Sequence, residues 1–131
     1  MSETTYTIGE MCRAFDVTPR ALRFYEQKEL LKPIRQGQHR HYTGRDRARL
    51  TLILRGKRFG FSLAEIRELL ELYYVGDGQV TQLTATLAAA ERHRVELTER
   101  RDELSTAIAE LDEQMDMIRG MLAERGKRVA S

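Results

Sequence analysis

The sequence predicts an all-α protein that carries one small β-hairpin, because three features of its 131 residues agree. Between residues 7 and 65, a hydroxyl residue three times precedes an acidic residue by three positions, which is a helix-start signal. A Gln-Gly turn lies between two short extended runs and indicates a hairpin. From about residue 81 onward, apolar residues repeat every seven positions without an intervening proline.

Two short helices are predicted first. The Thr-x-x-Glu sequence at 7–10 forms a capping box that opens a helix over residues 8–15. Thr18 caps a second helix, and Pro19 stands at its first position, where the missing N–H costs nothing. Arg20 and Arg23 lie three positions apart on one face of this helix, which is therefore basic.

The hairpin and two further helices follow. Residues 34–42, "IRQGQHRHY", are predicted to form two strands around the Gln-Gly turn. A Thr-x-x-Asp sequence at 43–46 opens a third helix, and Gly60 fits the left-handed position after its end. A Ser-x-x-Glu sequence at 62–65 opens a fourth helix, "SLAEIRELLELYY".

A Gly-Asp-Gly segment separates these elements from one long helix. We therefore predict a DNA-binding domain over residues 1–75, a hinge over 76–80, a dimerisation helix over 81–125 and a short tail over 126–131. Apolar residues form a heptad seam along the long helix: Leu97, Leu104, Ile108, Leu111, Met115, Ile118 and Leu122. Nothing else in the chain can cover this seam, so it implies a partner helix, most simply that of a second copy.

Charge is divided unevenly along the chain. Residues 1–60 contain 13 Lys and Arg and 6 Asp and Glu, whereas residues 61–131 contain 9 and 14. A basic head on an acidic tail suggests that the head meets a polyanion. The single cysteine, the lack of a signal peptide and the lack of a long apolar run predict a cytoplasmic protein without membrane contact.

Several spaced motifs occur together in the first half: "IGE", "LRFYE", a leucine pair before Pro33, "HRHY" and "GKRFGFSLAEI". From Tyr6 to Leu70 the sequence resembles the DNA-binding head of the MerR family of bacterial transcription regulators. The resemblance implies a winged helix-turn-helix followed by a long antiparallel coiled-coil dimerisation helix. Within the family, residues 44–73 are similar to the regulators of leucine, isovalerate and acyl-CoA breakdown.

The resemblance also implies which residues bind DNA. The second helix would enter the major groove, and the hairpin would act as a wing beside it. The implied DNA-binding residues are Thr18, Arg20, Arg23, Phe24, Tyr25, Arg40, His41, Tyr42, Lys57 and Arg58. Position 24 departs from the family pattern, in which the first ring of the pair is tyrosine. Phe24 has no hydroxyl, so only packing of its ring is expected.

The partners implied are double-stranded DNA, a second copy of the chain and RNA polymerase at the promoter. In the family, dimers commonly bind palindromic promoter sites and distort the DNA, and the deformation energy comes from contacts to the DNA backbone. A repressor that only occupies its site would use the same residues. The sequence assigns no small-molecule effector.

The same residues are also open to other interpretations. The basic residues could form an ordinary solvated face, and Cys12 is better explained as a small apolar filler than as a redox sensor. No metal or other cofactor is expected, because two histidines at 39 and 41 lack further ligands at a suitable spacing. No catalytic constellation is present, so an enzyme is not expected. An architectural DNA-binding protein and a coiled-coil adaptor remain as alternatives.

Overall fold

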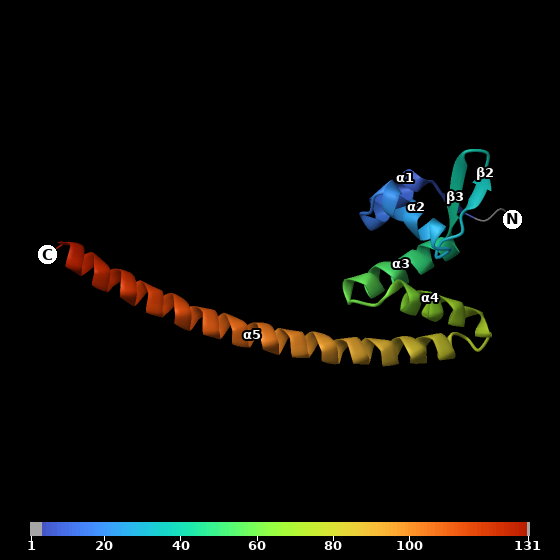
Figure 1. Cartoon of the computed structure of the whole chain (residues 1–131). Coiled ribbons are helices and arrows are strands. Elements are labelled where there is room, and N and C mark those ends of the chain that lie inside the picture. Colours follow the sequence, from blue (N-terminus) through green and yellow to red (C-terminus); the bar gives the residue numbers. More distant parts are fainter. Residues whose placement is uncertain (1–3, 131) are drawn as a thin grey trace. The chain divides into compact units, whose positions relative to one another are not determined.

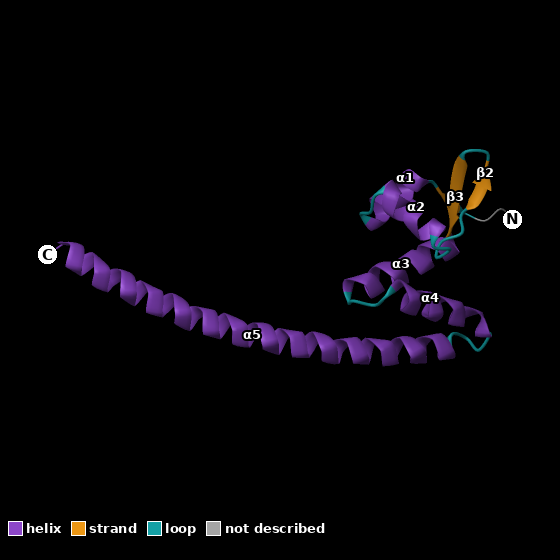
Figure 2. Cartoon of the chain, in the orientation of Figure 1, coloured by secondary structure: helices purple, strands orange, loops and turns teal. Residues whose placement is uncertain are grey.

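The computed structural model describes residues 4–130, without the side chains of residues 74 and 130. It contains short helices, a small sheet and one long C-terminal helix, as the sequence predicted (Figures 1 and 2). The helices are α1 (Ile8–Phe15), α2 (Pro19–Gln27), α3 (Gly44–Arg58), α4 (Leu63–Glu71), the 3-10 helix η1 (Leu72–Val75) and α5 (Val80–Ala130). The strands are β1 (Thr5–Tyr6), β2 (Ile34–Gln36) and β3 (His39–Thr43).

The helix-start signals act as predicted. The Thr7 hydroxyl accepts a hydrogen bond from the Glu10 backbone at 3.1 Å, and the Glu10 carboxylate accepts one from the Thr7 backbone at 3.0 Å. Thr43 and Asp46 form the same reciprocal pair at the start of α3. The hydroxyl of Ser62 accepts the Glu65 backbone N–H at 3.0 Å and opens α4. Local hydrogen bonds therefore fix where these helices begin.

The predicted hairpin is confirmed, and a third strand extends it. The strand order is β1-β3-β2, and both pairs are antiparallel. In the hairpin, Arg35 lies opposite Arg40, and Gly37 adopts a positive φ of 62° in the turn. The strand β1 was not predicted, because two residues are too short to show an alternating pattern.

The core is formed by residues of α1 to α4, of β3, of the segments between them and of the first part of α5. Its buried apolar residues are Met11, Leu22, Tyr25, Leu30, Leu31, Tyr42, Leu50, Ile53, Phe61, Ile66, Leu69, Leu70 and Ala89. The helices α3 and α4 approach closely at Gly56, where an added Cβ would lie 2.9 Å from Cγ1 of Ile66. A small residue at this position therefore sets the distance between the two helices.

The chain forms two compact units that divide between Ala90 and Glu91. Because Ala89 is only 1% exposed and belongs to the core, the first unit extends past the predicted boundary at residue 75. The long helix also differs from its predicted range of 81–125, since it continues to Ala130. Residues 126–130 contain no proline to end it, and residue 131 lies outside the described residues.

The seven predicted seam residues of α5 are all exposed, from 39% at Met115 to 64% at Leu122. Within the described residues, no helix is both long enough and apolar enough to cross a membrane.

Candidate nucleic-acid interface

The helix α2 separates a buried face from a basic face. Leu22 is fully buried, which fixes the side of the helix that meets the core. The Thr18 hydroxyl accepts the Ala21 backbone N–H at 3.1 Å and caps the helix. Arg20 and Arg23 are exposed, and within the described part of the chain no acidic side chain pairs with either of them. Their guanidinium groups can therefore donate to base edges or phosphates.

An exposed aromatic ring lies beside these arginines. Phe24 is 38% exposed, and the Nζ atom of Lys28 lies 5.7 Å from the centre of its ring. The rings of Phe24 and Tyr25 are 5.8 Å apart and tilted by 60°. Phe24 therefore adds an apolar contact surface to a basic helix, and such a surface can pack against sugars or thymine methyl groups.

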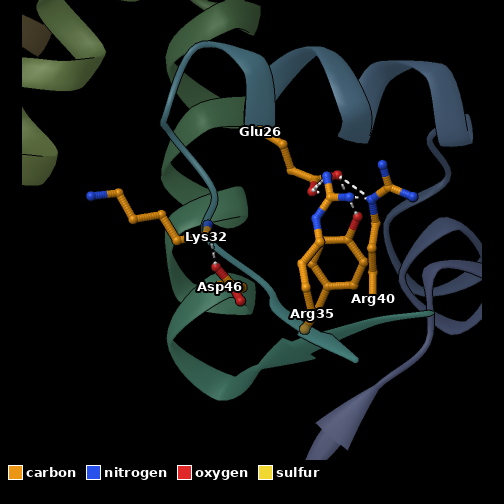
Figure 3. Close-up of polar contacts among 6 residues, drawn as sticks. Glu26, Lys32, Arg35, Arg40 and Asp46 are labelled. Atoms are coloured by element: carbon orange, nitrogen blue, oxygen red, sulfur yellow. Dashed lines mark hydrogen bonds and ion pairs between the residues drawn. The ribbon is translucent and has the colours of Figure 1, made fainter. Parts of the chain in front are cut away.

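The hairpin is attached to α2 by ion pairs. Arg40 Nε lies 2.9 and 3.1 Å from the two carboxylate oxygens of Glu26, and Arg35 Nη2 lies 3.3 Å from one of them (Figure 3). The Tyr42 hydroxyl donates to the same carboxylate at 3.1 Å. His41 lies on the opposite face of the strand from these residues and is partly exposed. The hairpin and the helix thus form one connected surface.

Two side chains of α3 hold the segment between α2 and β2. Asp46, which is 2% exposed, accepts the backbone N–H of Lys32 at 3.1 Å (Figure 3). Arg49 Nε donates to the backbone oxygen of Leu30 at 2.7 Å. Because these contacts come from α3, this helix fixes the exit of the chain from α2 and therefore the start of the hairpin.

The end of α3 adds two basic side chains to the first unit. Lys57 and Arg58 are both exposed. The Nζ atom of Lys57 lies 5.8 Å from the ring centre of Tyr25, so it stays close to α2. A phosphate beside α2 is a suitable partner for Lys57.

Two of the predicted DNA-binding residues need correction. Tyr25 is 4% exposed and Tyr42 is fully buried, so neither ring is available to DNA, and both serve the core. Burial raises the pKa of the Tyr42 hydroxyl well above its ordinary value, and the Glu26 carboxylate adds to the shift. The motif gave these rings a DNA contact, but Tyr25 shares the buried face of α2 with Leu22, three positions earlier, and Tyr42 packs into the core from β3 while its hydroxyl reaches Glu26.

The sequence prediction also missed residues that shape the surface. Glu26 and Asp46 touch both the helices and the segments between them, yet neither was selected as a site residue. One sequence signal could have identified them: each is an acidic residue in a segment that is otherwise basic. A buried carboxylate needs hydrogen-bond donors nearby, and such a segment supplies them. Among the described residues, no group of three or more His, Cys, Asp or Glu could hold a metal ion.

This geometry defines a class of protein: a winged helix-turn-helix with a basic helix and an attached hairpin. Two family models match the chain, one described as MerR HTH family regulatory protein over residues 6–72 and one as MerR, DNA binding over residues 47–125. The chain belongs to the MerR family of DNA-binding transcriptional regulators.

Individual relatives agree with this assignment. The chain is 38% identical over 101 residues to the uncharacterized HTH-type transcriptional regulator PA4778 of Pseudomonas aeruginosa, covering 76% of this chain and 74% of that protein. A MerR family transcriptional regulator from Bacillus cereus has a similar structure, with a TM-score of 0.68, 29% identity and coverage of 84% and 79%. HiNmlR, a MerR family regulator lacking the sensor domain and solved bound to promoter DNA, has the same fold, with a TM-score of 0.62, 24% identity and coverage of 78% and 80%.

Proposed function

We propose that this protein binds a palindromic promoter operator as a homodimer and controls transcription there. The observation that carries the proposal is the exposed pair Arg20 and Arg23 on α2, beside a hairpin that the Glu26 ion pairs attach to the same helix. A helix of this kind reads the major groove, while the hairpin reaches the neighbouring DNA backbone. The eight exposed or partly exposed residues proposed to touch DNA are Thr18, Arg20, Arg23, Phe24, Arg40, His41, Lys57 and Arg58.

The seam of α5 supports the homodimer. A helix of 51 residues is about 75 Å long at 1.5 Å per residue. Its seven apolar seam residues are exposed in the single chain, and burying each against a partner helix would contribute about 1.5–3 kcal/mol. The partner that carries a seam of the same length and spacing is a second copy, paired in antiparallel fashion as the family resemblance implies.

We further propose that the dimer acts at the promoter together with RNA polymerase in the cytoplasm. Distortion of the promoter is consistent with the family, and its cost of a few kcal/mol would come from the phosphate contacts of the two heads. Alternatively, the dimer acts as a repressor that only occupies the same operator. The similarity to regulators of leucine, isovalerate and acyl-CoA breakdown stays a prediction.

Selection of bound duplexes from a random pool, followed by footprinting upstream of the protein's own gene, tests the proposal. We expect an inverted repeat, two chains per duplex, and a preference over random DNA of at least about a thousandfold. Binding of all duplexes with equal affinity would instead identify an architectural protein. No DNA binding, with a protein partner retained on α5, would identify a coiled-coil adaptor.

A further inference from the structure

One carboxylate joins the recognition helix to the wing. Glu26 lies in the last turn of α2, and its side chain is 10% exposed. It accepts hydrogen bonds from Arg35, Arg40 and Tyr42, which all come from the hairpin (Figure 3). Through these contacts a single side chain connects the two parts of the proposed DNA-binding surface.

The hairpin needs a negative charge at this place. Arg35 and Arg40 are directly opposite each other in the strand pairing, and like charges in this arrangement repel. One oxygen of Glu26 lies 3.3 Å from Arg35 Nη2 and 3.1 Å from Arg40 Nε, so it bridges the two guanidinium groups. The acid thus allows two arginines to occupy one cross-strand pair.

The same contact leaves part of Arg40 available. Both hydrogen bonds to Glu26 use Nε, and the terminal nitrogens of Arg40 are turned away from the carboxylate (Figure 3). The Arg40 side chain remains 22% exposed. A planar guanidinium held along one edge can still donate from its free end to a phosphate oxygen.

We propose that Glu26 is a positioning residue for DNA binding: it holds the wing against α2 and presents the terminal N–H groups of Arg40 to a phosphate. This inference rests on the proposed function. It goes further because it assigns a role to an acidic residue that carries no favourable charge for DNA.

The sign of the effect distinguishes this role from simple electrostatics. A carboxylate close to DNA repels phosphates, so its neutralisation would ordinarily strengthen binding. If Glu26 instead acts by positioning Arg40, the Glu26→Gln change weakens binding although it removes a negative charge. The two interpretations therefore predict opposite changes in affinity.

The experiment measures binding of the full chain to the duplex obtained by selection, over a range of salt concentrations. We expect Glu26→Gln and Arg40→Gln each to weaken binding about tenfold and to lower the salt slope by about 1. The double variant should bind like Arg40→Gln alone, because both changes remove the same contact. Glu29→Gln is the matched control, since it removes an exposed acid three residues away and should leave affinity unchanged or slightly increased.

Thermal unfolding of each variant shows whether it is folded. If Glu26→Gln does not fold, Arg40→Lys tests the same point, because lysine keeps the charge but has no Nε edge for Glu26 to hold. We expect Arg40→Lys to bind as weakly as Arg40→Gln. Wild-type affinity for either Glu26→Gln or Arg40→Lys would overturn the inference.

A measurement without DNA separates this inference from the proposed function. In the NMR spectrum of the free protein, the Arg40 Nε–H resonance should shift on Glu26→Gln and not on Glu29→Gln. If wild-type protein has no preference for the selected duplex, the proposed function fails. The NMR measurement still tests whether Glu26 contacts Arg40, because it needs no DNA. An unmoved Arg40 resonance would contradict the positioning contact itself.

Discussion

Arg23 is one of two exposed arginines on α2 whose loss should weaken DNA binding. It is exposed on α2, and no acidic side chain within the described residues pairs with it. Replacement by alanine should weaken binding to the selected duplex by about 1–3 kcal/mol without lowering the melting temperature. Arg119→Ala is the control, because Arg119 pairs with Asp116 on α5 and lies in the second unit. Equal losses of DNA affinity for both variants would show that the net charge of the protein, and not the position of Arg23, determines binding.

Tyr42 predicts a pH dependence of stability. Burial raises the pKa of its hydroxyl in the folded state above the ordinary value of 10.0. The stabilisation from the neutral hydroxyl is therefore complete below about pH 10 and decreases at higher pH, because the unfolded chain then loses its proton more readily.

Denaturant unfolding between pH 8 and pH 11 measures this dependence. The free energy of unfolding of the wild type should fall above pH 10, and Tyr42→Phe should show a smaller decrease. At pH 8 the variant should be less stable, because Glu26 loses one donor. Parallel curves for the two proteins would rule out Tyr42 as the titrating group.

At the level of residues, the sequence predicted some roles and missed others for a clear reason. The exposed arginines followed from helical spacing, because residues three positions apart share a face. Tyr25 and Tyr42 were assigned to DNA, yet both are buried. The same spacing argument places Tyr25 on the inner face with Leu22, whereas the burial of Tyr42 depends on how β3 packs against the helices. The role of Glu26 depends on a contact with residues 14 and 16 positions later in the chain, which spacing within one helix does not show.

The pair α3 and α4 depends on one glycine. A Cβ at Gly56 would lie 2.9 Å from Cγ1 and 3.0 Å from Cδ1 of Ile66, which is fully buried. Although alanine normally favours a helix interior over glycine, Gly56→Ala should destabilise the protein by about 1–3 kcal/mol, because the core cannot take an added methyl group there.

Thermal and denaturant unfolding provide the measurement, and Gly44→Ala provides the control. Gly44 opens the same helix, and a Cβ there would meet nothing within 4 Å. This control should leave stability nearly unchanged. If Gly56→Ala were equally neutral, Ile66 would have to move aside at no cost, and the close approach of the helices would not be a constraint.

The elements themselves were largely predictable because their boundaries are local. Each helix start depends on two residues three positions apart. Reciprocal hydrogen bonds form at Thr7 and Thr43, and at Ser62 the hydroxyl accepts the backbone N–H of Glu65. The strand β1 has only two residues, and its pairing with β3 spans more than 30 positions, so no local signal marks it. The fourth helix was predicted to run through both tyrosines, whereas α4 ends at Glu71 and a 3-10 turn follows.

For the whole molecule, the proposed homodimer requires that the seam of α5 join two heads that bind one operator. A single head would bind only a half-site, while linking two heads raises the affinity without any new contact, typically by a factor of about 100 or more. Ile108 lies near the middle of the seam and is 59% exposed in the single chain. An aspartate there would place a charge inside the paired helices, where desolvation of an unpaired charge opposes association.

We therefore expect Ile108→Asp to sediment as a monomer and to lose at least about 100-fold in affinity for the full inverted repeat. Its affinity for a duplex with one half-site should equal that of the wild type, because the head is unchanged. Thr106→Asp introduces the same charge two residues away, off the seam, and should remain dimeric. A dimeric Ile108→Asp protein would show that the heptad seam is not the contact between copies. A monomeric wild type with full operator affinity would show that each half-site is bound independently. In both cases the length and regular spacing of α5 would need an explanation other than joining two reading heads.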